Sequence, residues 1–544
     1  MQIVKGEEYG REANRQYIQP KNTFNRGNIF FEYKDDKKFS AGMTISGFKL
    51  TINPNLIENA EDVYEKLSNI IEIDKDIFLY RANKKGDPYE EIKDRLDFES
   101  AEKIRELDLI GVSLEMDKWR FYPGNNLASH TLGFVAYNGD SLEGIYGVEK
   151  YYDYLLQRES KNLFVNFFAE IFSNLNQVIL EEGIKKEGDI IMTIEPSVQN
   201  YLENRLEELS DNWKTELAGG IIINPNNGEI YALGFSPTFD SNNFNKAEGI
   251  KFGNPMVENV YEMGSIIKAL TVAIGLDTGA VSADTIYNDK GSITLDGKTI
   301  SNYDGKARGV VELQQILNQS LNLGAVFVAQ EIGNKKFAKY LFDLGLGEET
   351  GIDLPNETYG LLSNLESNRD IEYATASFGQ GIAITPIGAV KALCTLANGG
   401  FLITPHLVKE IEYDIMPSEK LFYENERIFK EETSREISRM LSVVVDDALL
   451  GGTVKSDDYL IAAKTGTAQM VRENIGGYYE NKYLHSFFGY FPASKPEFLV
   501  FLYIIDPKEV KYSSQTLTHP FMDIFRFLIN YYEVIPDREN GREN

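Results

Sequence analysis

The stretch Tyr261-Glu-Met-Gly-Ser-Ile-Ile-Lys-Ala-Leu-Thr-Val-Ala-Ile274 decides the fold around a candidate reaction centre. Residues 265–274 are an apolar run of helical length that begins at a small polar residue after a glycine, which predicts a helix N-terminus at Ser265. Free backbone N–H groups and the positive end of the helix dipole favour an oxyanion there. Lys268 projects from the same helix face, so its amine can reach the Ser265 hydroxyl.

Lys268 is the nearest group in sequence that can activate this serine. A serine hydroxyl is a poor nucleophile until a base takes its proton, and Lys268 must be neutral to act as that base. Lowering a lysine pKa toward neutrality costs several kcal/mol, which burial and neighbouring positive charge must supply. The apolar helix provides burial, and we expect Lys464, in a later motif, to provide the charge.

The same Ser-x-x-Lys spacing occurs twice more, and its context rejects both cases. Ser46 and Lys49 lie in the alternating run 43–52, which predicts a strand, where residues three apart point to opposite faces. Ser100 and Lys103 lie in a charged run that predicts a solvated helix, and such a face does not depress a lysine pKa. Ser265 is therefore the candidate nucleophile.

A second motif, Ser320-Leu-Asn322, falls between two periodic runs, 313–317 and 325–329, and is predicted to connect two helices. A hydroxyl on this loop can pass a proton, and an amide offers both a donor and an acceptor to a peptide. Alone, such a string is more often a helix cap. The literal Ser-Asp-Asn at 210–212 lies upstream of the nucleophile and breaks the expected order.

A third motif lies in the strand candidate 459–470, which two further strand candidates follow at 483–491 and 498–505. The turn at 492–496 makes the three runs an antiparallel meander. The motif itself is Lys464-Thr465-Gly466-Thr467. Its glycine predicts the close approach of another backbone, such as a bound peptide adding to the sheet edge. Its lysine and threonine hydroxyls suit a carboxylate.

These three motifs occur in the order that penicillin-recognising enzymes use. With them, the chain resembles a class B penicillin-binding protein, a peptidoglycan D,D-transpeptidase of the division or elongation type. Other stretches that resemble this family run nearly end to end. They are Asn25-Arg-Gly-Asn-Ile29, Arg120-Phe-Tyr-Pro123, His130-Thr-Leu-Gly133, Gly144-Ile-Tyr-Gly-Val-Glu149, Thr193-Ile-Glu-Pro-Ser-Val-Gln199, Gly219-Gly-Ile-Ile-Ile-Asn-Pro225, Phe378-Gly-Gln-Gly381, Thr385-Pro386 and Ala397-Asn-Gly-Gly400.

The resemblance implies a role for each motif residue. Ser265 would form the acyl-enzyme with Lys268 as its base, while Ser320 and Asn322 would relay protons and position the substrate. The carboxylate site would comprise Lys464, Thr465, Gly466 and Thr467, and the oxyanion hole the N–H groups of Ser265 and Thr467. Two departures from the family pattern are Phe31, where an acid is usual, and Met263, where proline is usual.

The expected fold class is α/β (α+β) and multidomain. A β-rich N-terminal pedestal is predicted at residues 1–186, and a transpeptidase domain with an antiparallel sheet flanked by helices at 187–535. Residues 536–544 are predicted to be a solvated tail.

Composition excludes several other functions. A net charge of -28 argues against nucleic-acid binding. The single cysteine, Cys394, lies in an apolar run and is predicted to be core. The four histidines show no metal-ligand spacing, so neither a metal nor another cofactor is expected.

The chain as given contains no run of about 18 apolar residues, so neither a membrane span nor a signal peptide is predicted from it. Class B proteins carry one N-terminal transmembrane helix, and residues 2–9 resemble the segment that follows it. The resemblance therefore implies an extracytoplasmic, membrane-anchored enzyme in its full-length form. It also implies stem peptides and β-lactams as ligands, and a membrane-embedded glycosyltransferase and division or elongation proteins as partners.

Three alternatives remain open at this point. A serine β-lactamase or a D,D-carboxypeptidase would use the same nucleophile but deacylate with water. A catalytically silent scaffold would keep the fold alone. A separate expectation concerns residues 163–175, whose aromatic stripe predicts a helix packed between the two domains, with docking of a partner helix as the other interpretation.

Overall fold

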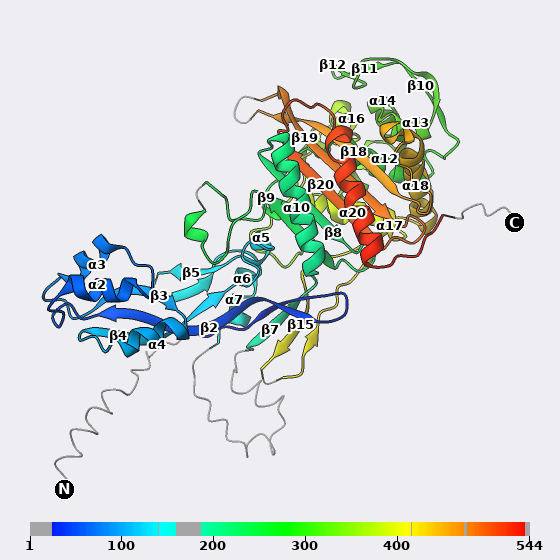
Figure 1. The fold of residues 1–544 in the computed structure, drawn as a ribbon. Helices are drawn as coiled ribbons and strands as arrows, with labels where there is room; N and C mark the ends of the chain where they lie inside the picture. Colours follow the sequence, from blue (N-terminus) through cyan, green and yellow to red (C-terminus); the bar gives the residue numbers. More distant parts are fainter. Residues whose placement is uncertain are drawn as a thin grey trace, which may run out of the picture.

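The computed structural model describes residues 24–139, 141–158, 186–247, 249–414, 416–472 and 476–538. Figure 1 shows two lobes: a β-rich N-terminal lobe, and a larger C-terminal lobe in which helices flank a sheet. This arrangement confirms the predicted fold class. The predicted helix over residues 163–175 lies outside the described residues.

The N-terminal lobe is organised on the long strand β2 (Lys38–Ile52), which pairs with β1 (Ile29–Glu32), β3 (Glu90–Leu96) and β4 (Val112–Phe121). Helices α2 (Ala60–Ser68), α3 (Lys75–Ala82) and α4 (Phe98–Glu106) bury their apolar sides against one another and the sheet. Smaller elements complete the lobe: α5 (Ser129–Leu132), β5 (Val135–Asn138), β6 (Ser141–Gly144), α6 (Gly147–Tyr151) and α7 (Asp153–Leu156).

The main sheet of this lobe takes strands from both sides of residue 187. Strands β7 (Gly188–Met192), β15 (Val408–Tyr413) and β16 (Glu419–Lys420) extend it in the order β16-β15-β7-β1-β2-β3. β7 runs parallel to β1, and the other pairs along this path are antiparallel. The division of the chain at residues 186 and 535 therefore stays a prediction.

Asp537 and Arg538, within the predicted solvated tail at 536–544, contact the C-terminal lobe, and the tail as a whole stays a prediction. The Asp537 carboxylate accepts hydrogen bonds from the Leu460 N–H at 2.7 Å and the Ser494 hydroxyl at 2.7 Å. Arg538 pairs with Asp446 at 2.8 Å. A short run of polar residues after a helix cannot by itself reveal such partners, which lie far away in the sequence.

A buried charge cluster holds the N-terminal lobe together where three of the family-like stretches meet. Glu149 has no exposed side-chain surface and accepts from Arg26 and Arg120 at 2.6 Å each. Tyr122 donates to the same carboxylate at 3.1 Å, and Arg120 also donates to the Gly27 carbonyl oxygen at 2.7 Å. Although burial acts to raise the pKa of Glu149, the two arginines bring it below its ordinary value.

We expect Glu149→Ala to destabilise this lobe by about 3–5 kcal/mol, because it removes the buried carboxylate shared by two buried guanidinium groups and leaves Arg26 with Asp153 alone. Urea unfolding followed by tryptophan fluorescence measures the loss. The control is Glu99→Ala, which removes an exposed partner of Lys103 and should leave the unfolding midpoint unchanged. Similar losses in the two variants would contradict a structural role for the cluster.

The C-terminal lobe is built on a five-stranded antiparallel sheet in the order β18-β19-β20-β8-β9. The strands are β18 (Ala462–Val471), β19 (Tyr478–Phe491), β20 (Phe498–Ile505), β8 (Leu217–Ile223) and β9 (Ile230–Ser236). The meander expected from the sequence is confirmed, and β19 begins five residues earlier than expected. Every residue of the central strand β20 is buried, which explains its unbroken apolar sequence.

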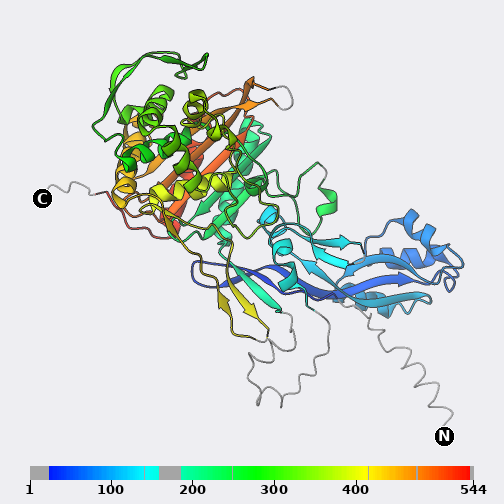
Figure 2. The ribbon, with the colours of Figure 1, turned by 180° about the vertical axis from the view of Figure 1, so that it is seen from behind.

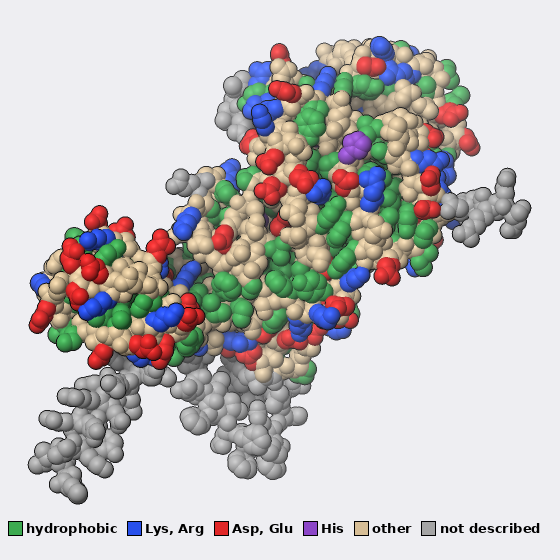
Figure 3. All heavy atoms as spheres, in the orientation of Figure 1, with side chains coloured by type: hydrophobic (Ala, Val, Ile, Leu, Met, Phe, Trp, Pro, Cys, Tyr) green, Lys and Arg blue, Asp and Glu red, His purple; other side chains and the backbone are tan. Residues whose placement is uncertain are grey.

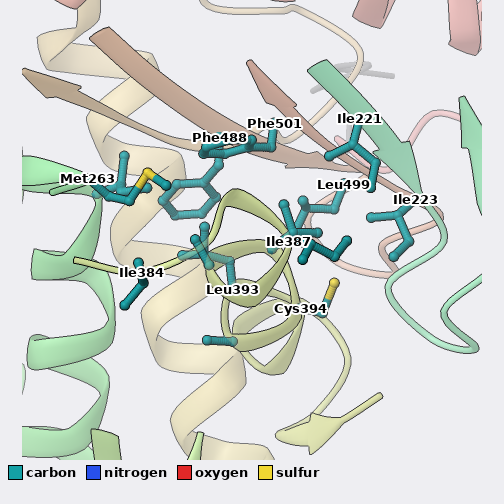
Figure 4. Close-up of a cluster of buried hydrophobic side chains, with 14 of the residues drawn as sticks. Ile221, Ile223, Met263, Ile384, Ile387, Leu393, Cys394, Phe488, Leu499 and Phe501 are labelled. Carbon is teal, nitrogen blue, oxygen red and sulfur yellow. The ribbon is translucent and has the colours of Figure 1, made fainter. Parts of the chain in front are cut away.

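Helices cover both faces of this sheet (Figures 1 and 2). α10 (Pro196–Trp213) and α20 (Thr518–Tyr531) pack on one face, and α17 (Pro386–Ala397) and α18 (Glu431–Val443) contact the other. Figure 4 shows Cys394 among the apolar side chains between α17 and the sheet, so its predicted place in the core is confirmed.

A helical and hairpin region completes the C-terminal lobe. Its elements are α11 (Pro255–Glu258), α12 (Ile267–Thr278), β10 (Ile286–Asp289), β11 (Ser292–Leu295), β12 (Lys298–Ser301), β13 (Gly309–Glu312), α13 (Gln314–Asn318), α14 (Asn322–Ile332), α15 (Asn334–Asp343), α16 (Asp370–Ala376), β14 (Phe401–Leu402), β17 (Glu426–Arg427) and α19 (Ser513–Thr516).

Acidic and basic side chains are interspersed over both lobes on the face seen in Figure 3. Among the described residues, no helix has the length and apolar character needed to cross a membrane.

Candidate active site

Ser265 lies in a single 3₁₀ turn, Gly264–Ile266, that leads directly into α12. The sequence placed the helix start at this serine, and the structure puts the α-helix two residues later. Gly264 has φ +63°, and a Cβ there would lie 2.9 Å from the Thr467 carbonyl oxygen. The turn that carries Ser265 therefore lies directly against β18, and only glycine allows this approach.

Lys268 extends from the first turn of α12 into a fully buried position. Its amine donates to the Ser320 carbonyl oxygen at 2.6 Å and lies 3.1 Å from the Ser320 hydroxyl. Burial and the positive charge of Lys464 lower the pKa of Lys268 well below its ordinary value. These are the two causes expected from the sequence, and they favour the neutral amine that a base requires.

Ser320 connects α13 to α14, as expected, and adopts a left-handed backbone conformation with φ +52°. Its hydroxyl lies between two amines, 3.1 Å from Lys268 Nζ and 3.3 Å from Lys464 Nζ. Burial lowers the pKa of Lys464 to about 8, and its amine also donates to the Thr465 carbonyl oxygen at 3.0 Å. A proton can therefore pass between the two lysines through one hydroxyl.

Asn322 is the first residue of α14, and its side-chain amide donates to the Ser301 carbonyl oxygen at 2.9 Å. This bond fixes the amide against the end of β12. The half-buried side chain remains on the wall of the cleft described below.

Thr465 and Thr467 lie on β18, which is the edge strand of the five-stranded sheet. Both are half-buried and line the cleft. The Thr467 hydroxyl oxygen accepts from the Ser513 backbone N–H at 3.1 Å, which leaves its own hydrogen to donate. Two hydroxyls and a lysine therefore gather at one sheet edge.

Gly466 packs closely against the Ser265 turn, and its predicted role in substrate binding stays a prediction. A Cβ at Gly466 would lie 2.3 Å from the Ser486 hydroxyl and 2.7 Å from the Met263 carbonyl oxygen. The backbone that comes close is therefore that of the Ser265 turn. Ser486 donates to the same Met263 oxygen at 2.9 Å, which anchors this turn to β19.

A cleft of about 510 Å³ brings the predicted residues together. Its lining includes Ser265, Ser320, Asn322, Lys464, Thr465 and Thr467, whereas Lys268 is buried behind this surface. The sequence interpretation missed several other lining residues: Tyr303, Phe378, Gln380, Gln469, Tyr483, Lys511 and Tyr512. Phe378 and Gln380 belong to a family-like stretch, but the others stand in no motif and are brought to the cleft only by the fold.

The rejected serines lie elsewhere. Ser46 is on the sheet of the N-terminal lobe and Ser100 on α4, as expected. Ser210 lies on α10, on the opposite face of the C-terminal sheet from α17. The described structure therefore supports Ser265 over these alternatives.

Two known protein families match this chain. Residues 218–526 match the penicillin binding protein transpeptidase domain, and residues 26–171 match the penicillin-binding protein dimerisation domain. Stage V sporulation protein D of Bacillus subtilis is 31% identical over 84% of this chain and 71% of its own length. Peptidoglycan D,D-transpeptidase FtsI of Escherichia coli is 27% identical over 84% of this chain and 75% of its own.

Solved structures share the fold. Penicillin binding protein 2X from Streptococcus thermophilus superposes with a TM-score of 0.75 at 19% identity, covering 94% of this chain and 81% of its own. Penicillin binding protein 3 from Mycobacterium tuberculosis, complexed with aztreonam, superposes with a TM-score of 0.71 at 19% identity, covering 95% of this chain and 98% of its own. With a transpeptidase match that covers more than half of its length, this chain belongs to the class B penicillin-binding proteins.

Proposed function

We propose that this protein is a peptidoglycan D,D-transpeptidase that cross-links stem peptides through an acyl-enzyme on Ser265. The observation that carries the proposal is the position of the Ser320 hydroxyl between the Lys268 and Lys464 amines, in the cleft that Ser265 also lines. The relatives that carry the name peptidoglycan D,D-transpeptidase support the same reaction.

Acylation begins with attack of the Ser265 oxygen on the carbonyl carbon of the penultimate D-residue. Neutral Lys268 takes the serine proton, and the carbon–nitrogen bond to the terminal D-residue then breaks. The departing amine needs a proton, which the buried pair of lysines delivers through the Ser320 hydroxyl. The products are an ester on Ser265 and a free D-amino acid.

Deacylation reverses these proton movements. The amine of a second stem peptide attacks the ester, loses a proton to Lys268 through the same relay, and forms the cross-linking amide. The serine oxygen leaves and recovers its proton. No step consumes a cofactor.

The strand β18 holds the substrate during both steps. Lys464 and the hydroxyls of Thr465 and Thr467 bind the terminal carboxylate of the donor peptide. The backbone N–H groups of Ser265 and Thr467 stabilise the oxyanion, and a donor of this kind contributes about 3 kcal/mol in other enzymes. The close packing of Gly264 against Thr467 supports this pairing.

The decisive experiment supplies a peptide ending in D-alanyl-D-alanine together with a labelled amine acceptor. We expect mass spectrometry to detect both released D-alanine and the acceptor joined to the shortened peptide. Release of D-alanine with only the hydrolysed peptide would indicate a D,D-carboxypeptidase. Absence of both products would indicate a silent scaffold.

A further prediction separates the transpeptidase from a β-lactamase: the penicilloyl-enzyme should persist for many minutes. Rapid hydrolysis requires a base that activates water, and a carboxylate can fill that role. Glu262, the nearest acid to Ser265 in sequence, has its carboxylate engaged by the Gly381 N–H and the Tyr478 hydroxyl. Intact mass measured over an hour after removal of free penicillin tests this expectation, and many turnovers of nitrocefin per second would contradict it.

The wider assignment follows the family. We propose stem peptides and β-lactams as ligands, and the aztreonam and ampicillin complexes of the Mycobacterium tuberculosis protein support the β-lactams. A membrane-embedded glycosyltransferase and division or elongation proteins are the proposed partners. An extracytoplasmic, membrane-anchored location of the full-length form is likewise a proposal, as are the pedestal at 1–186 and the transpeptidase domain at 187–535.

A further inference from the structure

Glu262 joins three segments that surround the nucleophile. It lies three residues before Ser265, and its Oε1 accepts from the Gly381 N–H at 2.9 Å. The Tyr478 hydroxyl lies 3.1 Å from each carboxylate oxygen. Gly381 ends the loop 378–381, and Tyr478 opens β19 opposite Val471, near the tip of the β18–β19 hairpin. One side chain therefore ties the Ser265 turn to this loop and to the hairpin.

The loop 378–381 in turn supports the Ser265 turn directly. The Gly264 N–H donates to the Gly379 carbonyl oxygen at 3.1 Å. A Cβ at Gly379 would lie 2.2 Å from the Gly264 carbonyl oxygen, so the two glycine backbones are in close contact. Phe378 and Gln380 of the same loop line the cleft. A shift of this loop would therefore move both the cleft wall and the backbone next to Ser265.

The surroundings of Glu262 suit a fixed hydrogen-bond acceptor. Burial raises the pKa of its carboxyl above the ordinary value, and the bonds from Gly381 and Tyr478 offset part of that rise. Burial and the negative charge of Glu262 raise the pKa of the Tyr478 hydroxyl, and Glu372 acts on it in the same direction. Tyr478 therefore remains a neutral donor to this carboxylate.

The Ser265 turn of this chain depends on such contacts. Residue 263 is methionine, so no proline ring restricts the backbone before Gly264. Ser486 holds the Met263 carbonyl oxygen from the sheet side, and Glu262 holds the loop on the other side. We infer that Glu262 is a positioning residue, whose carboxylate fixes Ser265 relative to Thr467 for acylation. This inference rests on the proposed function, because acylation of Ser265 is the step that it serves.

The test compares two variants of similar volume. Glu262→Leu cannot accept a hydrogen bond, whereas Glu262→Gln can accept from Gly381 and donate to the Tyr478 oxygen. We expect Glu262→Leu to lower the acylation rate constant at saturating fluorescent penicillin on the order of tenfold, since small displacements of reacting groups cost up to ~100-fold. The dissociation constant of the initial complex should change less than about twofold, and Glu262→Gln should restore most of the rate.

Two further variants keep the test decisive. Glu480→Leu changes an exposed acid on β19 and should leave the rate unchanged. Tyr478→Phe removes one hydrogen-bond donor to Glu262 and should slow acylation when introduced into the wild type. The same change introduced into Glu262→Leu should have no further effect. If Glu262→Leu does not fold, Tyr478→Phe alone serves as the test. An unchanged rate in Tyr478→Phe and Glu262→Leu would overturn the inference, and so would equal changes in rate and affinity. Absence of acylation in the wild type would instead overturn the proposed function.

Discussion

Ser265→Ala should abolish covalent labelling by penicillin completely. Alanine keeps the 3₁₀ turn and its contact with β18, because that contact uses backbone atoms of Gly264 and Thr467. The only group lost is the hydroxyl that attacks the β-lactam carbonyl. Intact-protein mass should show one adduct on the wild type and none on the variant, and peptide mapping should place the wild-type adduct on Ser265.

The control for this prediction is built into the chain. Ser46 and Ser100 have the same spacing to a lysine, but both lie in the N-terminal lobe, outside the cleft. Alanine at either position should leave labelling at full stoichiometry. Full labelling of Ser265→Ala would show that another serine is the nucleophile, and the proposed mechanism would then fail.

Local periodicity explains why much of this site could be predicted from the sequence. The helix after Ser265, the loop at Ser320 and the β18–β19–β20 meander each follow from a short pattern of apolar and turn residues. The lowered pKa of Lys268 also follows, because its helix is predominantly apolar and Lys464 belongs to the third motif.

Contacts between residues that lie far apart in the sequence explain which features could not be predicted. The partner of Gly466 is the Met263 carbonyl oxygen, more than 200 residues away, and sequence spacing carries no signal for it. Tyr303 and Tyr512 reach the cleft from separate segments, and their rings meet edge to face with 6.1 Å between the ring centroids. The sheet that joins β1 to β7 and β15 likewise depends on pairing across the predicted domain boundary. Such features are properties of the tertiary fold alone.

Lys268→Arg should lower the acylation rate constant by on the order of 10³-fold, within the range that loss of a general base causes. Arginine keeps its proton at every accessible pH and cannot receive the one that Ser265 must lose. Lys464→Arg should be milder, because a cation that binds a carboxylate can be replaced by another. Equal losses in the two variants, measured by stopped-flow acylation, would contradict these separate roles.

The pH dependence of acylation tests the same assignment in the wild type. Burial and Lys464 lower the pKa of Lys268, so its neutral, active form is lost as the pH falls through that lowered pKa. Lys464 has a pKa of about 8, so its positive charge is lost as the pH rises through about 8 and the carboxylate of the substrate binds less tightly. The efficiency of acylation should therefore follow a bell-shaped profile with its alkaline limb near pH 8. In Lys464→Arg the alkaline limb should move to higher pH, because arginine stays charged. An alkaline limb that stayed near pH 8 in this variant would show that another group causes it.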